Sequence, residues 1–342
     1  MADKEFFKEN KKTLGVIRWD AWYGHDGNPQ SVITAVERAL SPEEFHFRAP
    51  FFAKVTEDNN IIIPEYTQEI FDKEMEYAIE AGIDYFAYVF YIDDMKKARE
   101  MHLKSKYKND VKLAFFTHGF PEERVSEYIK YFKDDCYMKL ENGRPLMYYF
   151  CAFSVAKKCI ELLKDGCEKA GIPIPFSVVC NIGTEDTINS GADAKGQYAV
   201  AGRNGMSFSL VREEAQKLWQ SFKETGMQYV PTVSTGYHTL PRVKNPVFWM
   251  KCSEEGWAEY ATADEIAEHL QEAYDHLDEN NGQTNLNTLL MYAWNEHDEG
   301  GWICPTLEVD ENGNQLFDEN GNALINRERI DAIKKVTSKY KT

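Results

Sequence analysis

Apolar runs of strand length alternate with amphipathic stretches of helix length along the whole chain. The strand-like runs lie at residues 14–19, 83–92, 111–117, 146–150, 176–180, 228–233 and 288–294, with a weakly defined run near 206–210. Helical spacing of apolar positions marks residues 29–40, 66–81, 94–107, 121–132, 155–170, 212–225 and 263–279, and an irregular aromatic segment covers 45–64. This alternation predicts an α/β protein with a parallel sheet.

The number and character of these strands favour a (β/α)8 TIM barrel over an open, doubly wound sheet. There are about eight candidate strands, and polar or aromatic residues follow most of them. The first strand leads into Trp19-Asp20-Ala21-Trp22-Tyr23-Gly24, which is aromatic and lacks a glycine-rich nucleotide-binding fingerprint. We therefore expect one catalytic barrel domain over residues 1–342, with a charged N-terminal tail at 1–12 and inserted loops.

The C-terminal part carries two similar segments, Asp-Glu-Asn-Gly-Asn, at 310–314 and 318–322. They lack the spacing and bidentate glutamate of a calcium-binding EF-hand, whereas Asn-Gly between short apolar runs is typical of a hairpin turn. The sequence predicts a C-terminal β-hairpin followed by a last helix at 327–339.

Composition excludes several partners. The net charge of −17 repels phosphate backbones, so nucleic acid is not an expected partner. No apolar run approaches the roughly 18 residues needed to span a bilayer, and no signal peptide is recognisable. The seven cysteines lack zinc-site spacing and several follow apolar residues, which favours reduced, buried thiols. We expect a cytoplasmic protein without a cofactor, or a periplasmic or secreted one if a leader has been removed.

The candidate chemistry lies where the last strand ends, in Trp294-Asn295-Glu296-His297-Asp298-Glu299-Gly300-Gly301-Trp302. Two carboxylates can supply the acid and the base of glycosidic bond cleavage. If the chain turns after Trp294, Glu296 and Glu299 share one face at about 5–6 Å between Cβ atoms. One charge then raises the pKa of the other group, leaving one carboxyl protonated. A continuing strand would separate them.

The ends of the other strands supply aromatic, amide and imidazole groups that suit a sugar. The predicted substrate-binding residues are Trp19, Asp20, Trp22, Tyr23, Tyr88, Tyr91, His118, Asn181, Tyr237, His238, Trp294, Asn295 and Trp302. Structural alternatives apply to them, since rings at strand ends often close a barrel, histidines bond to the backbone, and Asp20 can cap a turn.

The segment from Asn295 to Pro305 resembles the late-strand motif of glycoside hydrolase family 99 and the WbsX-like proteins, relatives of family 71. In that motif Asn-Glu-x-x-Glu-Gly is followed after four residues by proline, and residues 21–24 match the family's early Trp-Tyr-Gly segment. The resemblance implies a TIM barrel in which Glu296 is the base and Glu299 the general acid. It also implies that the base takes the proton of the substrate's 2-hydroxyl, which attacks the anomeric carbon to give an epoxide, with overall retention. His297 and Cys304 depart from the motif at positions where an aromatic residue and an acid are usual.

Three functional hypotheses follow. The first is a retaining glycoside hydrolase (EC 3.2.1.-) acting on an oligo- or polysaccharide. The second is a barrel that binds carbohydrate without turnover, or one associated with polysaccharide biosynthesis. The third is a metal-dependent hydrolase using Asp20, His118, His238 and Glu296, although the histidines lack compact metal-ligand spacing.

Overall fold

Nine parallel strands form one curled, barrel-like sheet in the part of the chain that the computed structural model describes, residues 12–23, 27–91, 95–284 and 286–341. The strands are β1 (Thr13–Arg18), β4 (Tyr85–Phe90), β5 (Lys112–Thr117), β6 (Leu146–Tyr149), β7 (Phe176–Cys180), β8 (Ala194–Gly196), β9 with β10 (Gln228–Tyr229 and Thr232–Ser234), and β11 (Thr288–Tyr292). β9 pairs with β8, and β10, two residues later, pairs with β11. The two ends of the sheet are therefore strands that follow one another along the chain, and the predicted α/β barrel fold is confirmed.

The barrel interior is filled by side chains that alternate along each strand. The Tyr85 hydroxyl reaches across the barrel to the hydroxyls of Tyr148, at 2.7 Å, and Thr288, at 3.0 Å. A Cβ atom at position 15 would lie 2.0 Å from the Tyr85 ring, so Gly15 makes room for it. Three positions along β4, Tyr88 points the other way and bonds to His102 of the helix layer.

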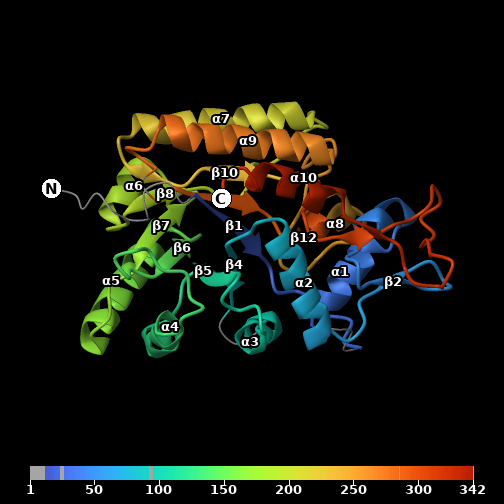
Figure 1. The fold of residues 1–342 in the computed structure, drawn as a ribbon, viewed down its shortest axis with the longest axis horizontal. Coiled ribbons are helices and arrows are strands. Elements are labelled where there is room, and N and C mark those ends of the chain that lie inside the picture. Colours follow the sequence, from blue (N-terminus) through green and yellow to red (C-terminus); the bar gives the residue numbers. More distant parts are fainter. Residues whose placement is uncertain (1–11, 24–26, 92–94, 285, 342) are drawn as a thin grey trace.

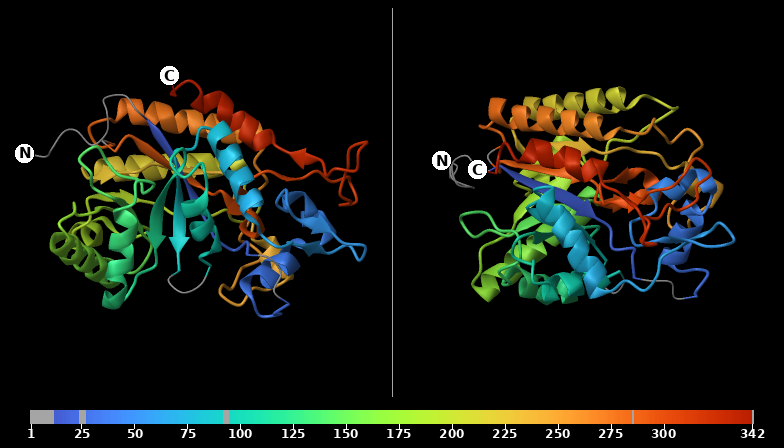
Figure 2. Two further views of the ribbon diagram at one scale, coloured as in Figure 1. Left: turned by 60° about the horizontal axis from the view of Figure 1, so that its bottom comes forward. Right: turned by 45° about the vertical axis from the view of Figure 1, so that its right-hand side comes forward.

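Helices surround the barrel (Figure 1). They are α2 (Gln68–Glu80), α3 (Lys97–Lys104), α4 (Val125–Phe132), α5 (Phe153–Ala170), α6 (Thr184–Asn189), α7 (Phe208–Glu224), α9 (Ala263–Glu279) and α10 (Glu328–Thr337). Figure 2 shows α7, α9 and α10 on one side of the barrel and α2 to α5 on the other. A capping box of Thr262 and Glu265 begins α9, and Gly171 in the left-handed conformation ends α5.

Further elements gather at one side of the barrel, on the right in Figure 1: α1 (Val32–Leu40), α8 (Leu240–Lys244), and the aromatic insertion with η1 (Glu43–Arg48), β2 (Lys54–Val55) and β3 (Ile61–Ile62). There the chain's C-terminal part forms β14 (Thr306–Leu307) and β15 (Ile325–Asn326). Between them, Asp310 and Asp318 each accept backbone N–H groups within their own Asn-Gly turn. The predicted hairpin and last helix are confirmed.

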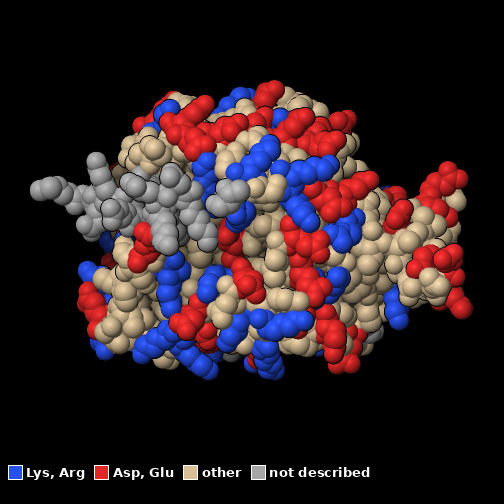
Figure 3. Space-filling view, in the orientation of Figure 1, with Lys and Arg blue, Asp and Glu red and all other residues tan. Residues whose placement is uncertain are grey.

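Two predictions need comment. The strand near 206–210 is wrong, because Phe208 already begins α7 and the missing strand is β8. The charged tail at 1–12 falls almost wholly outside the described residues. All seven cysteines are free, and none of the described helices is long and apolar enough to cross a membrane. On the face drawn in Figure 3, acidic and basic side chains are interspersed.

Candidate active site

The segment after β11 folds back on itself as a small hairpin. β12 (Asn295–Glu296) pairs antiparallel with β13 (Gly301–Trp302), and the 3-10 turn η3 (His297–Glu299) joins them. The turn that was required to bring Glu296 and Glu299 together is therefore present.

Glycines allow the loop after β10 to lie directly against this turn. A Cβ atom at Gly236, whose φ is +138°, would meet the carbonyl oxygen of Gly300 at 2.4 Å. One at Gly300 would meet the backbone of His238 at 2.6 Å, and one at Gly301 would meet the Tyr292 ring at 2.3 Å. Since no larger residue fits these contacts, the paired glycines hold Glu299 and Tyr292 in register.

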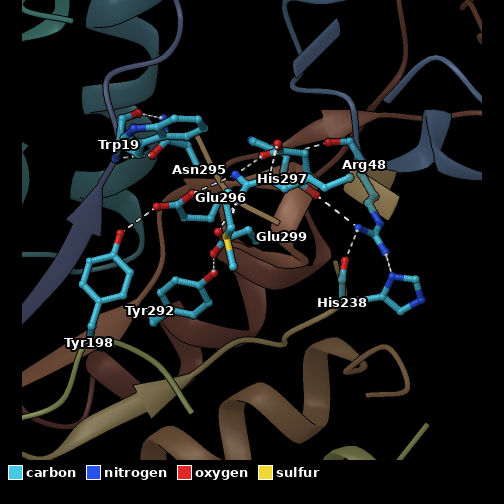
Figure 4. Close-up of polar contacts among 12 residues, drawn as sticks. Trp19, Arg48, Tyr198, His238, Tyr292, Asn295, Glu296, His297 and Glu299 are labelled. Atoms are coloured by element: carbon cyan, nitrogen blue, oxygen red, sulfur yellow. Dashed lines mark hydrogen bonds and ion pairs between the residues drawn. The ribbon is translucent and has the colours of Figure 1, made fainter. Parts of the chain in front are cut away.

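One arginine connects the two glutamates. Arg242 of α8 forms an ion pair with Glu299, and its Nη2 lies 3.9 Å from Oε2 of Glu296. It also donates to Asp298, from Nε at 2.7 Å and from Nη2 at 3.1 Å. The side chain of Glu299 is 13% exposed and that of Glu296 only 5%, so solvent reaches the pair mainly at Glu299. The two acids lie side by side in Figure 4.

Each glutamate also accepts a hydrogen bond from a tyrosine (Figure 4). Tyr198 donates to Oε1 of Glu296 at 2.7 Å, and Tyr292 donates to Oε2 of Glu299 at 2.5 Å. Asn181 holds Tyr198 by accepting its backbone N–H at 2.9 Å. Burial, reinforced by the two glutamate charges, raises the pKa of both tyrosines well above the usual value, so both remain donors.

Burial and the neighbouring charge of Glu299 raise the pKa of Glu296 well above its usual value, while Arg242 and Tyr198 lower it. The contacts therefore favour a single proton on the pair. This proton is located on Glu296, while Glu299 forms an ion pair with Arg242. Such a pair has one group that can donate a proton and one that can accept it.

Aromatic rings lie around the pair. Trp19 packs against Trp249 at 5.4 Å between ring centroids, and the Arg242 guanidinium lies 5.5 Å from both rings. Burial raises the pKa values of Tyr91 and Tyr237 to about 12, and the glutamate charges contribute to both shifts. Asn295 fixes Trp19 by bonding to its backbone N–H and C=O at 2.9 and 2.5 Å, so Asn295 positions a ring and is itself fully buried.

Several predicted substrate-binding residues lie elsewhere. Tyr88 and Trp294 face the helix layer, where Trp294 donates to Glu74 at 2.9 Å. Trp22 is fully buried beside Phe52, and Trp302 packs under Arg329 at 3.7 Å. These four rings therefore pack within the protein and away from the glutamate pair, and their contact with substrate stays a prediction.

Two predicted polar residues, Asp20 and His238, also have partners other than the glutamates. Asp20 is fully buried and accepts the backbone N–H of Ala98 at 2.9 Å, so it caps α3. Burial raises the pKa of Asp20 to about 7. His238 turns away from the glutamates toward Arg48, whose Nη2 lies 2.6 Å from its Nδ1 (Figure 4). Burial and Arg48 lower the pKa of His238 to about 3.

The last two predicted residues, His118 and Tyr23, are bonded to groups other than the glutamates. His118 stacks on Tyr91 at 5.6 Å and bonds to the carbonyl of Phe150, and the Tyr23 hydroxyl accepts the N–H of Ile33 at 3.3 Å. Among the described residues no group of three His, Cys, Asp or Glu side chains is arranged to hold a metal ion. The four residues of the metal-dependent hypothesis, Asp20, His118, His238 and Glu296, each form hydrogen bonds with different groups of the protein.

Sequence reasoning missed Arg242, Tyr198, Tyr292, Asp298 and Trp249. Asp298 lies inside the motif and Tyr292 ends the strand β11 just before it, where alternation and the turn could have pointed to them. Tyr198 and Arg242 follow short strands or loops with little hydrophobic pattern, so only the folded barrel brings them to the pair.

The chain is similar in structure to the GH99 endo-alpha-mannosidase from Bacteroides thetaiotaomicron. The similarity extends to two structures, one of them in complex with BIS-TRIS-propane, each with a TM-score of 0.58 and covering 99% of this chain and 98% of that chain. Sequence identity is only 13% and 12%, so the likeness concerns the fold. No protein-family model and no curated protein matches the sequence.

Proposed function

We propose that the protein is a glycoside hydrolase in which Glu296 and Glu299 share the acid and base work of glycosidic cleavage. The observation that carries this proposal is the coupled pair itself: two nearly buried carboxylates, one arginine between them, and a phenol donor on each. A merely structural pair would be expected to have one cation per carboxylate. Here Arg242 serves three acids, which favours a proton on one of them.

We propose a glycan as the substrate class, and the structural likeness to an endo-alpha-mannosidase is our reason for testing α-linked mannan first. By resemblance to family 99, Glu299 is the acid and Glu296 is the base that takes the 2-hydroxyl proton. The contacts of Glu296 favour the proton on Glu296 instead. The order of the two roles is therefore a separate part of the proposal, with its own test.

The first experiment measures new reducing ends on α- and β-linked mannans, glucans and galactans. We expect cleavage of at least one by the wild type and loss of turnover in Glu296→Gln and in Glu299→Gln. Glu268→Gln, which changes a carboxylate on the outer surface, is the matched control. Normal turnover in both site variants contradicts the proposal. Activity abolished by a chelator would revive a metal-dependent reaction.

The second experiment uses aryl glycosides of the sugar that is cleaved, with leaving groups of different acidity. A variant without its general acid still cleaves a 2,4-dinitrophenyl glycoside, because that leaving group needs no proton. If Glu299 is the acid, Glu299→Gln retains this activity and Glu296→Gln does not. The opposite result exchanges the two roles. Retention is checked by NMR of the first-formed anomer.

A barrel that binds glycans without turnover is the second candidate, because Tyr198 and Tyr292 already occupy one oxygen of each glutamate. Binding to a glycan array without any new reducing ends would favour it.

A further inference from the structure

Aromatic side chains continue from the glutamate pair to the surface through the loop between α8 and α9. Phe248 packs edge-on against Trp249 at 4.8 Å between centroids, and Trp249 lies 5.4 Å from Trp19. Arg242, which contacts the glutamates, lies 5.5 Å from Trp249 and donates to the sulfur of Met250 at 3.5 Å. The loop is therefore joined to the active site by direct contacts.

This loop exposes large apolar side chains that the core does not use. Phe248 is 65% exposed and Met250 is 37% exposed. The same residues, with Arg242 and Trp249, line an open surface hollow of about 490 Å³. An exposed aromatic cluster beside a polar site indicates a binding surface, because burial of Phe248 contributes little to the stability of the barrel.

We propose that Phe248 and Trp249 form a platform for one further neutral sugar residue of the substrate chain, next to the residue held at Glu296 and Glu299. This inference rests on the proposed function and deepens it: the substrate is an extended oligo- or polysaccharide, and the platform sets the preference for chain length. Below, "the platform" means these two rings.

The chemistry of the hollow selects a neutral sugar. The apolar C–H face of a pyranose packs on an indole or phenyl ring, and its hydroxyls remain at the solvent-facing rim. Arg242 is committed to Asp298 and Glu299, so its charge is already neutralised toward an anionic sugar. A uronate on the platform would also meet the negative charge of the pair.

The test is affinity electrophoresis in gels cast with soluble α-mannan, β-mannan, α-glucan, β-glucan or galactan. It is carried out in the Glu299→Gln background, so that no probe is cleaved. Phe248→Ala is the main variant, because its side chain lies outside the core, and Trp249→Phe is the second. Phe317→Ala is the matched control, since Phe317 is 55% exposed on the C-terminal hairpin.

We expect at least one gel to retard the parent protein and the Phe317→Ala variant. Loss of the Phe248 ring should weaken that affinity roughly three- to tenfold, as expected for one aromatic stacking contact. Retardation that is unchanged in both platform variants would overturn the inference, and so would retardation in none of the five gels. A change of oligomeric state in Phe248→Ala, measured by light scattering, would assign the surface to self-association and also overturn it.

Kinetics separate this inference from the proposed function. With the active protein, Phe248→Ala should raise KM for oligomers long enough to reach the platform while leaving the shortest cleavable substrate unaffected. If Phe248→Ala reduces cleavage equally at every chain length, the platform is contradicted but the proposed hydrolase function is not. If binding depends on the platform but no glycan is cleaved, the proposed hydrolase function is contradicted but the platform is not.

Discussion

Replacing Arg242 by methionine removes one positive charge from among three carboxylates while keeping an unbranched side chain that fills part of the same space. The guanidinium is 1% exposed, as is Asp298, and the Glu296 and Glu299 side chains are 5% and 13% exposed. Removing one partner of a buried pair costs about 3–5 kcal/mol, because the remaining charge is left without compensation. Set against a typical unfolding free energy of about 5–15 kcal/mol, Arg242→Met should unfold at a much lower urea concentration.

The deficit should depend on pH with a defined sign. The folded-state pKa of Glu296 is raised above the usual value of a glutamate, so the folded protein takes up a proton that the unfolded chain releases. Below the pKa of Glu296 in the unfolded chain, the raised pKa does not lower the free energy of unfolding. The free energy of unfolding then falls as pH rises from that value to the pKa of Glu296 in the folded protein. Arg242 lowers the pKa of Glu296. Without Arg242 the pH range over which the free energy of unfolding falls extends to higher pH. The loss of stability in Arg242→Met therefore grows from pH 5 to pH 7.5.

Urea unfolding followed by tryptophan fluorescence at these two pH values measures both effects. Arg212→Met is the control, because Arg212 pairs with Glu268 and Glu272 at the surface and should cost about 1 kcal/mol or less. Asp298→Asn added to Arg242→Met should restore part of the loss, which a double-mutant cycle measures. A loss below about 1 kcal/mol at pH 7.5, or a deficit identical at both pH values, would refute the electrostatic account of the site.

Two further changes probe single contacts. Tyr198→Phe removes the hydrogen-bond donor to Glu296, so the pKa of Glu296 rises further. The kcat/KM–pH profile should then move to higher pH and its maximum should fall about 10- to 100-fold, whereas an unchanged profile contradicts this role of Tyr198. Asp20→Asn tests the buried cap of α3: burial raises the pKa of Asp20 from 3.8 to about 7, so wild-type stability falls across that range. The variant lacks this dependence and should gain stability relative to the wild type between pH 4.5 and 7.5, whereas parallel urea midpoints would show that the carboxyl does not titrate there.

The barrel could be predicted because most of its strands are apolar runs of five or six residues that are buried on both faces. β8 could not, because Ala194-Lys195-Gly196 has no hydrophobic pattern. Its place is fixed by pairing with β7 and β9, which is information held by the rest of the sheet. The same reason explains the false strand at 206–210, where an apolar stretch is the start of a helix.

The candidate site divides along similar lines. Strand alternation could have separated Tyr88 from Tyr91, since positions three apart on a strand face opposite sides. The glutamate pair was predictable because its geometry depends on a local turn. Arg242 was not, because it reaches the pair only through the pairing of β10 with β11, which brings the loops after these strands together.

The hairpin after β11 shows how a short sequence can fix two carboxylates before any substrate arrives. Of the six residues from Trp294 to Glu299, four are bound into the surrounding structure: Trp294 to Glu74, Asn295 to the backbone of Trp19, His297 to the carbonyl of Arg48, and Asp298 to Arg242. Their partners belong to α2, to the residue that follows β1, to η1 and to α8, so four separate segments hold the hairpin. Glu296 and Glu299 are the two that remain, and tyrosines and one shared arginine orient them. Because the scaffold sets the orientation, little reorganisation would be required as charge develops on a substrate, and the proposed acid and base pair needs such preorganisation.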